Sequence, residues 1–532
     1  MRMKKKILLV AGMMGCGLMQ AQDIYKMEML SGQDLNGTAR FVGMGGAMNA
    51  IGADISTMST NPAGIGLFRR GEVSTTASLC IQTNGRDLMD HGKTRLSFDQ
   101  LGVVVPIKMD DGEFKYLNFG FNYHKYRNLK GYVGTSAQTN GLSQSWQMMD
   151  LTFTNRYLDL DYSPDRELTT PLTLLGYDTK MLEPRFDNEG KVSGYDAVQA
   201  RDYNYQRVQW GGVHEYDFNF SANFSDQIFV GMTVGVYDVD IHSGVRYGEN
   251  IYDPAGGEGT FPYAMVQREH LSGSGVDFKF GVILRPIETG SFRIGAYVHS
   301  PIFYALQSDQ YLVMESPFED VINSSTTLPY TTRDIDPGRN EYNLHTPWRF
   351  NLSMGGTLAG CLALDAEYEY RDFSTCQVRY PYVFNEYDYF ADGEKDYALK
   401  REAENYLAGV STIRLGAELR AEGGAYLRAG YNYETSPFKK DAFLNQFTPS
   451  SSYYYSCNTD YINLSGINRW TGGIGYRGSS FYADMAYQYQ HQSGRVYPFH
   501  VPTANSDIAN KLSGRKFDMS KHQIMLTLGY RF

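Results

Sequence analysis

The last eleven residues of the chain read His522-Gln523-Ile524-Met525-Leu526-Thr527-Leu528-Gly529-Tyr530-Arg531-Phe532. Every second position from Ile524 to Phe532 is apolar or aromatic, and the positions between them include Gln523, Thr527 and Arg531. Because successive side chains of a β-strand point to opposite faces, this segment presents one apolar and one polar face. Its length is that of a tilted strand crossing a bilayer, and its aromatic end suits the boundary between lipid and water.

The same alternation recurs along the chain. It is found in 117–124, 215–224, 362–370, 413–420 and 481–490. A soluble β-sandwich also alternates, so the pattern alone leaves two interpretations open. The apolar faces are unusually aromatic and the polar faces carry many charges, which favours lipid outside and a wet lumen inside.

Alternation and turn signals together predict fourteen strands. We place them near 72–84, 94–108, 114–134, 209–225, 227–248, 272–286, 291–315, 342–358, 360–378, 409–422, 424–436, 468–477, 479–492 and 519–532. Short and longer connections alternate strictly, as in barrels with short periplasmic turns and long extracellular loops. Trp210, Trp348 and Trp470 fall near the outer strand ends, where an aromatic girdle belongs. The predicted fold class is all-β, a 14-stranded antiparallel transmembrane β-barrel with a small N-terminal helical hatch plugging the lumen.

The chain divides into three predicted parts. Residues 1–22, with basic residues followed by a short apolar stretch, read as a signal peptide. Residues 23–70 do not alternate and contain glycine turns, which predicts short helical patches. A barrel of fourteen strands is too wide to be filled by its own side chains, so we expect 23–70 to be a hatch inside a barrel formed by 71–532. The candidate ligand-binding or hatch residues are Phe41, Met44, Met48, Asn61, Pro62, Ala63, Gly64 and Phe68.

Several motifs of the predicted hatch resemble the FadL family of channels for long-chain fatty acids and other hydrophobic compounds, TodX-like members included. They are Gly37-Thr38-Ala39-Arg40, Gly43-Met44-Gly45-Gly46-Ala47, Ala53-Asp54 and Asn61-Pro62-Ala63-Gly64. They are most similar to the Bacteroidetes branch, whose members are often labelled hemin receptors. The resemblance is strong over 31–70, general over the barrel and absent in the long loops. It implies passive uptake across the bacterial outer membrane through a hatch-plugged barrel, in this family often sideways through a gap in the wall.

A kinked strand is one source of such a gap. Gly131 and Gly134 in the third strand and Pro301 in the seventh are candidates, because proline removes a ladder hydrogen bond and glycine weakens one. For each of these residues, the alternative to a wall gap is an ordinary bend or bulge of the barrel strand. Asn61 and Pro62 are expected to fix a turn within the hatch.

Enzyme chemistry finds little support in the sequence. Asp365, Glu367 and Glu369 share one strand face, but hydrated lumen charges are the expected role of such a row. There is no nucleophile elbow, HExxH motif or phosphate loop, and the ten histidines are scattered. We therefore expect no catalytic residues, no metal ligands and no cofactor. The formal charge of -10 and the lack of a basic stripe argue against nucleic acid.

The favoured function is uptake of hydrophobic small molecules such as long-chain fatty acids. The alternatives are a secretion-associated binding or assembly barrel and a hemin-binding receptor. The hatch argues against an open diffusion porin, and the strand number argues against a TonB-coupled transporter. Expected partners are outer-membrane lipid and a hydrophobic ligand, and both a monomeric barrel and partner proteins bound through extracellular loops remain open.

Two local features of the long loops complete these expectations. Residues 135–208 contain a candidate short helix at 143–151. The loops form either a folded canopy, which we favour, or a binding surface. Cys80, Cys361, Cys376 and Cys457 are no disulfide framework, and a bridge between Cys376 and Cys457 is as acceptable as free thiols.

Overall fold

The computed structural model describes most of the chain outside its N-terminus. The described residues are 23–83, 94–109, 112–152, 158–166, 169–252, 259–287, 290–316, 331–335, 339–380, 394–445, 458–501 and 512–532. The predicted signal peptide, 1–22, and Cys457 lie outside these ranges. Cys376 is a free, buried thiol with its Sγ atom 3.3 Å from Ser31 Oγ.

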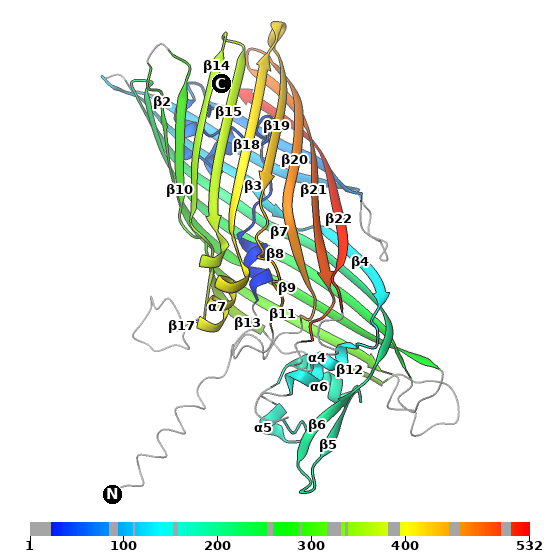
Figure 1. Ribbon diagram of the computed structural model, residues 1–532. Coiled ribbons are helices and arrows are strands. Elements are labelled where there is room, and N and C mark those ends of the chain that lie inside the picture. The colour runs from blue at the N-terminus through cyan, green and yellow to red at the C-terminus, as the bar shows by residue number, and fades with distance from the viewer. Residues whose placement is uncertain are drawn as a thin grey trace, which may run out of the picture.

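Fourteen antiparallel strand paths form one closed sheet (Figure 1), which confirms the predicted fold class. The sheet closes where β1 pairs with β22. In chain order the paths are β1 Glu72–Gln82; β2 Thr94–Lys108; β3 Phe114–Asn128 with β4 Gly131–Gln138; β7 Ala200–Phe224; β8 Ile228–Tyr252; β9 Thr260–Leu284; β10 Arg293–His299 with β11 Phe303–Ser316; β12 Thr331–Ile335, β13 Arg339–His345 and β14 Arg349–Leu358; β15 Leu362–Asp372 with β16 Gln377–Tyr380; β17 Glu394–Lys395 with β18 Gly409–Arg420; β19 Ala425–Glu434; β20 Tyr461–Arg477; β21 Phe481–Tyr497; and β22 Arg515–Arg531.

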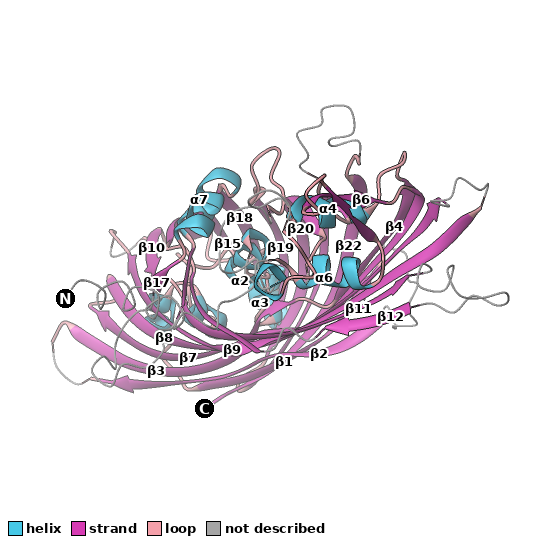
Figure 2. Ribbon diagram, turned by 90° about the horizontal axis from the view of Figure 1, so that it is seen from below, coloured by secondary structure: helices cyan, strands magenta, loops and turns pink. Residues whose placement is uncertain are grey.

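In the described residues, four short helices precede the first strand and lie inside the ring of strands, where Figure 2 places α2 and α3. They are α2 Ile24–Ser31, α3 Ala39–Gly43 and the 3₁₀ helices η1 Ile55–Ser59 and η2 Pro62–Leu67. Each begins at a residue whose side chain accepts a backbone N–H: Asp23, Thr38, Asp54 and Asn61. Among the described residues, no helix is long and apolar enough to cross a membrane.

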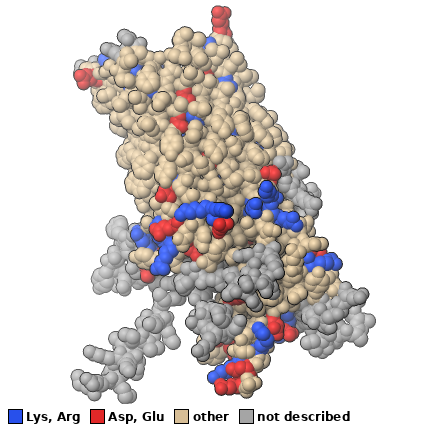
Figure 3. Space-filling model, in the orientation of Figure 1, with Lys and Arg blue, Asp and Glu red and all other residues tan. Residues whose placement is uncertain are grey.

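Strand β8 shows where the bilayer lies. From Ile228 to Val236 its outward side chains are apolar, whereas from Asp238 onward they are mostly polar. The inward row changes in the opposite sense, with Val239 and Ile241 buried in the lumen. On the face shown in Figure 3, few charged side chains interrupt the middle of the wall, and more gather toward its lower end. The lower end of Figure 1, opposite the short turns, is therefore the extracellular end.

Some strands are longer than the sequence predicted. β7 begins at Ala200 rather than near 209, and β9 begins at Thr260 rather than near 272. On the extracellular side of the apolar band the outward side chains are polar, and the sequence pattern there does not distinguish a strand from a loop. The backbone stays paired because the inward row is largely apolar there and packs within the lumen.

The loop between β4 and β7 folds into a small canopy beyond the strand ends (Figure 1). It contains α4 Gln144–Leu151, capped by Ser143, which confirms the helix predicted there. It also contains α5 Ser163–Arg166, α6 Pro171–Asp178 and the hairpin of β5 Leu182–Phe186 and β6 Val192–Ala197. A further helix, α7 Tyr397–Tyr406, lies in a loop for which none was predicted.

One buried carboxyl group outside the apolar band connects this canopy to the barrel. Glu249 near the end of β8 accepts hydrogen bonds from Ser143 Oγ at 2.6 Å, from the Gln144 backbone N–H at 2.7 Å and from the Tyr247 hydroxyl. Burial raises the pKa of the Glu249 carboxyl to about 7, and these hydrogen bonds oppose the rise. The start of α4 is thus docked on a group that titrates near neutrality.

The docked canopy should loosen as the pH rises from about 4.5 to about 7, because the folded-state pKa of Glu249 lies above its unfolded value. The stability that this group contributes is fully present below the lower value and lost above the higher one. Hydrogen exchange of 139–152 at pH 5.5 and pH 8, compared at each pH with Glu249→Gln, measures the effect. Equal pH dependence in both proteins would contradict the assignment.

Candidate functional site

Buried ion pairs anchor the hatch to the barrel wall. Arg40, at the start of α3, donates from Nε and Nη2 to the two carboxylate oxygens of Glu418 on β18, each at 2.8 Å. Glu418 also accepts from Arg428 Nε at 2.6 Å, and Arg428 Nη1 donates to Asp484 at 2.6 Å. This chain of charges runs from α3 across β18, β19 and β21. The hatch is therefore fastened by two-pronged, charge-assisted hydrogen bonds.

The acidic row on β15 forms a second anchor. Asn49 donates from its backbone N–H and its side-chain amide to Glu367, at 2.8 and 2.6 Å. Asp365 accepts the backbone N–H groups of Ala50 and Ile51 at 3.1 and 3.0 Å. Glu369 lies 3.0 Å from an Arg414 nitrogen. The expectation of hydrated lumen charges was wrong, because all three carboxylates are buried, two of them against the hatch and Glu369 against Arg414.

The Asn61-Pro62 turn is packed against three neighbouring strands. Asn61 caps η2 and donates to the carbonyl oxygens of Asn49 at 2.8 Å and Val282 at 3.3 Å. The Pro62 carbonyl accepts from Ser221 Oγ at 2.8 Å. A Cβ atom at Gly231 would lie 2.3 Å from the Pro62 carbonyl carbon, so glycine permits this close approach. The predicted role of Asn61 and Pro62 in fixing a hatch turn agrees with this geometry.

The candidate residues chosen from the sequence all lie buried in the hatch and its contacts. Phe41, Met44 and Met48 share one apolar cluster. Phe68 packs with Ile55 and Met58, and Ala63 packs with Phe229 and Ile283. Among the described residues that line the cavities below, none is one of the eight candidates. Their contact with a ligand therefore remains a prediction, whereas their packing in the plug is observed.

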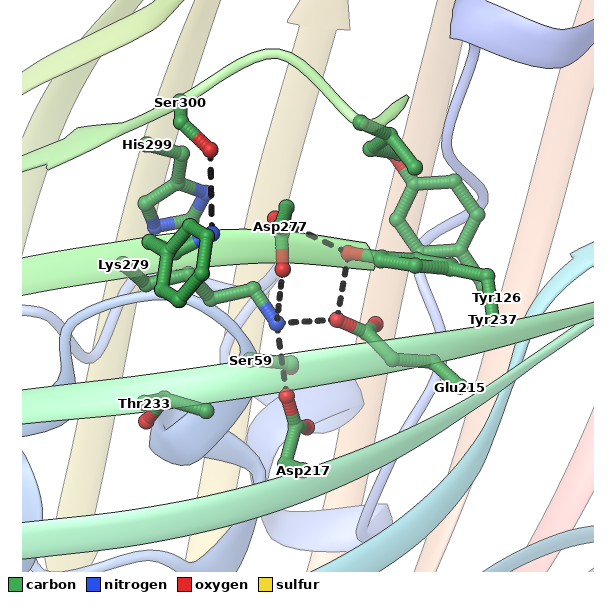
Figure 4. A network of polar contacts seen from close by, with 12 residues as sticks. Ser59, Tyr126, Glu215, Asp217, Thr233, Tyr237, Asp277, Lys279, His299 and Ser300 are labelled. Carbon is green, nitrogen blue, oxygen red and sulfur yellow. Dashed lines mark hydrogen bonds and ion pairs between the residues drawn. The ribbon is translucent and has the colours of Figure 1, made fainter. Parts of the chain in front are cut away.

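A buried cluster of charges lies beside the hatch on β7 and β9 (Figure 4). Lys279 Nζ contacts Glu215, lies 2.6 Å from Asp217 and lies 3.5 Å from Asp277. The Tyr237 hydroxyl donates to Glu215 at 2.6 Å and lies 3.0 Å from Asp277 Oδ2. His124 Nε2 lies 3.2 Å from the other Glu215 oxygen. These pairings join strands β3, β7, β8 and β9 behind the hatch.

A cavity of about 180 Å³ lies inside the barrel next to α2. Its lining mixes apolar and charged groups. The apolar part includes Met29, Leu129, Val133, Ile241, Leu271, Ile467 and Phe517, and the charged part includes Lys26, Arg127, Arg207, Glu269 and Lys521. Such a lining suits a molecule with an apolar body and a polar end.

The barrel wall is incompletely paired near this cavity. Backbone pairing between β2 and β3 ends at Gln100–His124 among the described residues. Among the described residues, the part of β2 beyond that point, back to Thr94, pairs with β1 alone, and β4 pairs with β7 alone. Leu96 lies on this stretch of β2, whose edge away from β1 has no partner among the described residues, and its side chain is 83% exposed. In the described part of the wall, the ladder is therefore open between β2 and β4.

A second cavity of about 260 Å³ lies at this gap. Arg95, Leu96 and Ser97 line it from β2, and Lys130 and Tyr132 line it from the other side. Five residues line both cavities: Asp34, Asn128, Tyr132, Gln490 and Lys521. The lumen cavity and the gap cavity thus adjoin each other.

The residues predicted to kink a strand have different outcomes. Gly131 begins β4 at the edge of the gap, and Gly134 lies within β4. Pro301 lies between β10 and β11, where the ladder continues, since the Ser300 N–H donates to the Phe278 carbonyl at 2.9 Å. Opposite the break, Gly211 of β7 has φ 88°, a conformation that favours glycine. The structure thus places the opening beside Gly131 and only a paired bend at Pro301.

Placing 23–70 in the lumen did not predict that α2 would pack in its extracellular half. Ile24, Met27 and Leu30 are at most 1% exposed and pack against the inward apolar rows of β7, β8, β9 and β11. Lys26 forms an ion pair with Glu269. The signal that could have revealed this core is the inverted polarity of β8 after residue 237 in the sequence. There the inward row of side chains is apolar and the outward row is not.

Comparisons with known proteins agree with this architecture. No family model matches the sequence, and no curated protein sequence does. A solved FadL homologue from Pseudomonas aeruginosa is 12% identical, with a TM-score of 0.50 over 94% of this chain and 99% of that chain. The CymD monoaromatic hydrocarbon channel is 11% identical and the Pseudomonas putida toluene transporter TodX 10%, both with TM-scores of 0.47, over 94% of this chain and 99% of theirs. At these identities the similarity concerns the fold.

Replacing Arg40 by alanine should loosen the hatch, because Glu418 loses its hatch partner although it keeps Arg428. Removing one member of a buried ion pair destabilises a folded protein by about 3–5 kcal/mol. We expect a loss near the lower value here, because Glu418 keeps its ion pair with Arg428. The measurement is ion conductance of single barrels in a planar bilayer, where Arg40→Ala should open more often than the parent protein.

The matched control is Arg185→Ala, which removes an exposed pair with Asp196 in the β5–β6 hairpin. Exposed pairs contribute about 0–1 kcal/mol, so this variant should conduct like the parent. A closed Arg40→Ala barrel would show that the ion pair does not hold the hatch.

Proposed function

We propose that the protein is a passive channel of the bacterial outer membrane for hydrophobic small molecules. The observation that carries the proposal is the adjoining pair of cavities, one beside α2 in the lumen and one at a break in the wall. The apolar outer band and the short and long loop ends suit an outer-membrane barrel. The channels and transporters of similar fold add support at the level of architecture.

The proposed path begins at the extracellular end, passes the side of α2 and leaves through the gap between β2 and β4. A path straight through the barrel is blocked by the hatch, which is fixed by Arg40, Asn49 and Asn61. An apolar solute has no need to cross that plug, because the gap leads toward lipid. Movement of α2 and widening of the gap are then sufficient for passage.

Long-chain fatty acids are the substrates that we favour. The apolar lining accommodates an acyl chain, and Lys521 lines both cavities, where its ammonium group can pair with a carboxylate. Arg127 and Arg207 are engaged with Glu28 and Asp460, which leaves Lys521 as the better-placed partner.

Extraction of the protein purified from native outer membranes should release bound amphipathic molecules. Mass spectrometry, with an unrelated barrel as control, should find fatty acids enriched in the parent protein and reduced in Lys521→Gln. Enrichment of a porphyrin would instead favour the hemin receptor. An empty cavity together with a tightly retained partner protein would favour the assembly barrel and contradict the proposal.

Linking the two sides of the gap should block uptake. Ser97→Cys and Lys130→Cys, in a background with the other mature-chain cysteines changed to serine, place thiols on opposite sides of the gap cavity. A flexible bifunctional maleimide should then reduce uptake of labelled fatty acid by cells. The control pair, Arg185→Cys and Ser193→Cys, is linked within the exposed β5–β6 hairpin and should leave uptake unchanged. Unchanged uptake with the gap linked would exclude this exit.

A further inference from the structure

Two histidines lie side by side on the outside of the barrel, on the extracellular side of the apolar band. His242 on β8 is paired in register with His270 on β9, and Trp210 on β7 is paired with His242. The two imidazole rings are parallel within 3°, with centroids 4.1 Å apart. The Trp210 ring stacks on the far side of His242 at 5.1 Å. The three rings therefore form one row across three strands.

A carboxylate completes this group. Asp240 lies two residues before His242 on the same face of β8, and its Oδ1 atom is 3.2 Å from His242 Nε2 and 2.9 Å from His270 Nε2. All three side chains are at least partly exposed. Two imidazole nitrogens thus converge on one carboxylate oxygen from neighbouring strands.

We propose that Asp240, His242 and His270 bind one divalent transition-metal ion, such as Zn²⁺ or Cu²⁺. With bonds of about 2.1 Å, neighbouring ligand atoms of a tetrahedral or octahedral ion lie about 3.0–3.4 Å apart. The two distances to Asp240 Oδ1, 2.9 and 3.2 Å, lie close to that range. Because the two imidazole planes are parallel within 3°, binding requires each ring to rotate until its Nε2 lone pair points at the ion.

The ligand chemistry selects the class of metal. Two imidazoles and one carboxylate suit Zn²⁺, Cu²⁺ or Ni²⁺, whereas Ca²⁺ and Mg²⁺ prefer oxygen ligands throughout. Trp210 covers one face of His242 and limits the positions of its ring. Without a metal ion, both imidazoles can donate an N–H to the Asp240 carboxylate. These hydrogen bonds alone would also account for the short distances, and the experiment below distinguishes the two explanations.

The position indicates what the metal would do. The site bridges β8 and β9, the strands that carry Lys279 and the Gly231 contact with the hatch, and it lies outside both cavities. A bound ion would tie this hairpin together where it leaves the lipid. It would therefore stabilise the extracellular extension without touching the solute path.

The test uses full-length mature protein in detergent, freed of metal by a chelator and carrying no polyhistidine tag. Titration with Zn²⁺ should show one saturable site, and Cu²⁺ should give an electron paramagnetic resonance spectrum with coupling to two nitrogens. His242→Ala and His270→Ala should each weaken binding more than tenfold and abolish the two-nitrogen pattern. Zn²⁺ should also raise the unfolding temperature of the parent protein, and not of these variants.

His214→Ala is the matched control, because His214 is a half-buried histidine of the adjacent β7 bonded to Tyr123. It should bind metal like the parent protein. His124→Ala tests the buried group of His124, Glu215 and Asp217, which also has ligand-like spacing. No saturable Zn²⁺ binding, binding that survives loss of both His242 and His270, or binding lost only in His124→Ala would each overturn the proposal. A heat-dependent gel shift shows that each variant is folded.

Discussion

The requirement that every backbone polar group be paired within lipid governs this structure. An unpaired amide in hydrocarbon costs several kcal/mol, so a strand can cross the membrane only in a closed sheet. Closure through β1 and β22 meets that requirement and encloses a lumen that strand side chains alone cannot fill. The hatch fills this lumen. Its part from α3 to η2 lies between the ion-pair anchors, and its helix α2 fills the apolar extracellular part. The break between β2 and β4 is the exception, since there the ladder is left open in the described part of the wall.

Buried charged contacts fasten the hatch to the barrel wall. Arg40, Glu418 and Arg428 connect the hatch to one side of the barrel, and Asp365 and Glu367 receive it on another. Buried charges are costly when they are unpaired, so such contacts favour one position of the plug over many similar ones. A plug held in this way resists gradual deformation, and passage at its side demands less rearrangement than passage through it.

The sequence was sufficient to predict the strand number, the positions of the short turns and the helix after Ser143, because these depend on local periodicity and capping. It could not predict which inward charges meet the hatch, since Arg40 and Glu418 are 378 residues apart. The histidines looked scattered for the same reason, as only the β8–β9 register brings His242 beside His270. The extracellular ends of β7 and β9 could not be predicted because their polarity is inverted. The burial of Glu367 and Asp365 could not be predicted because their partners Asn49 and Ile51 lie 318 and 314 residues away in the sequence.

The polarity change along β8 fixes how deeply the barrel sits in the membrane. If the barrel sank by two residues, the charge of Asp238 would enter hydrocarbon, and if it rose, Val236 would meet water. The β2–β3 ladder ends at His124, which is paired with Glu215 on β7, and Glu215 is paired with Tyr237 on β8. Tyr237 lies at the polarity change of β8. On the path proposed above, a solute leaves close to the headgroups of the outer leaflet. It joins the outermost lipid layer first, and its crossing to the inner leaflet requires no contact with the barrel.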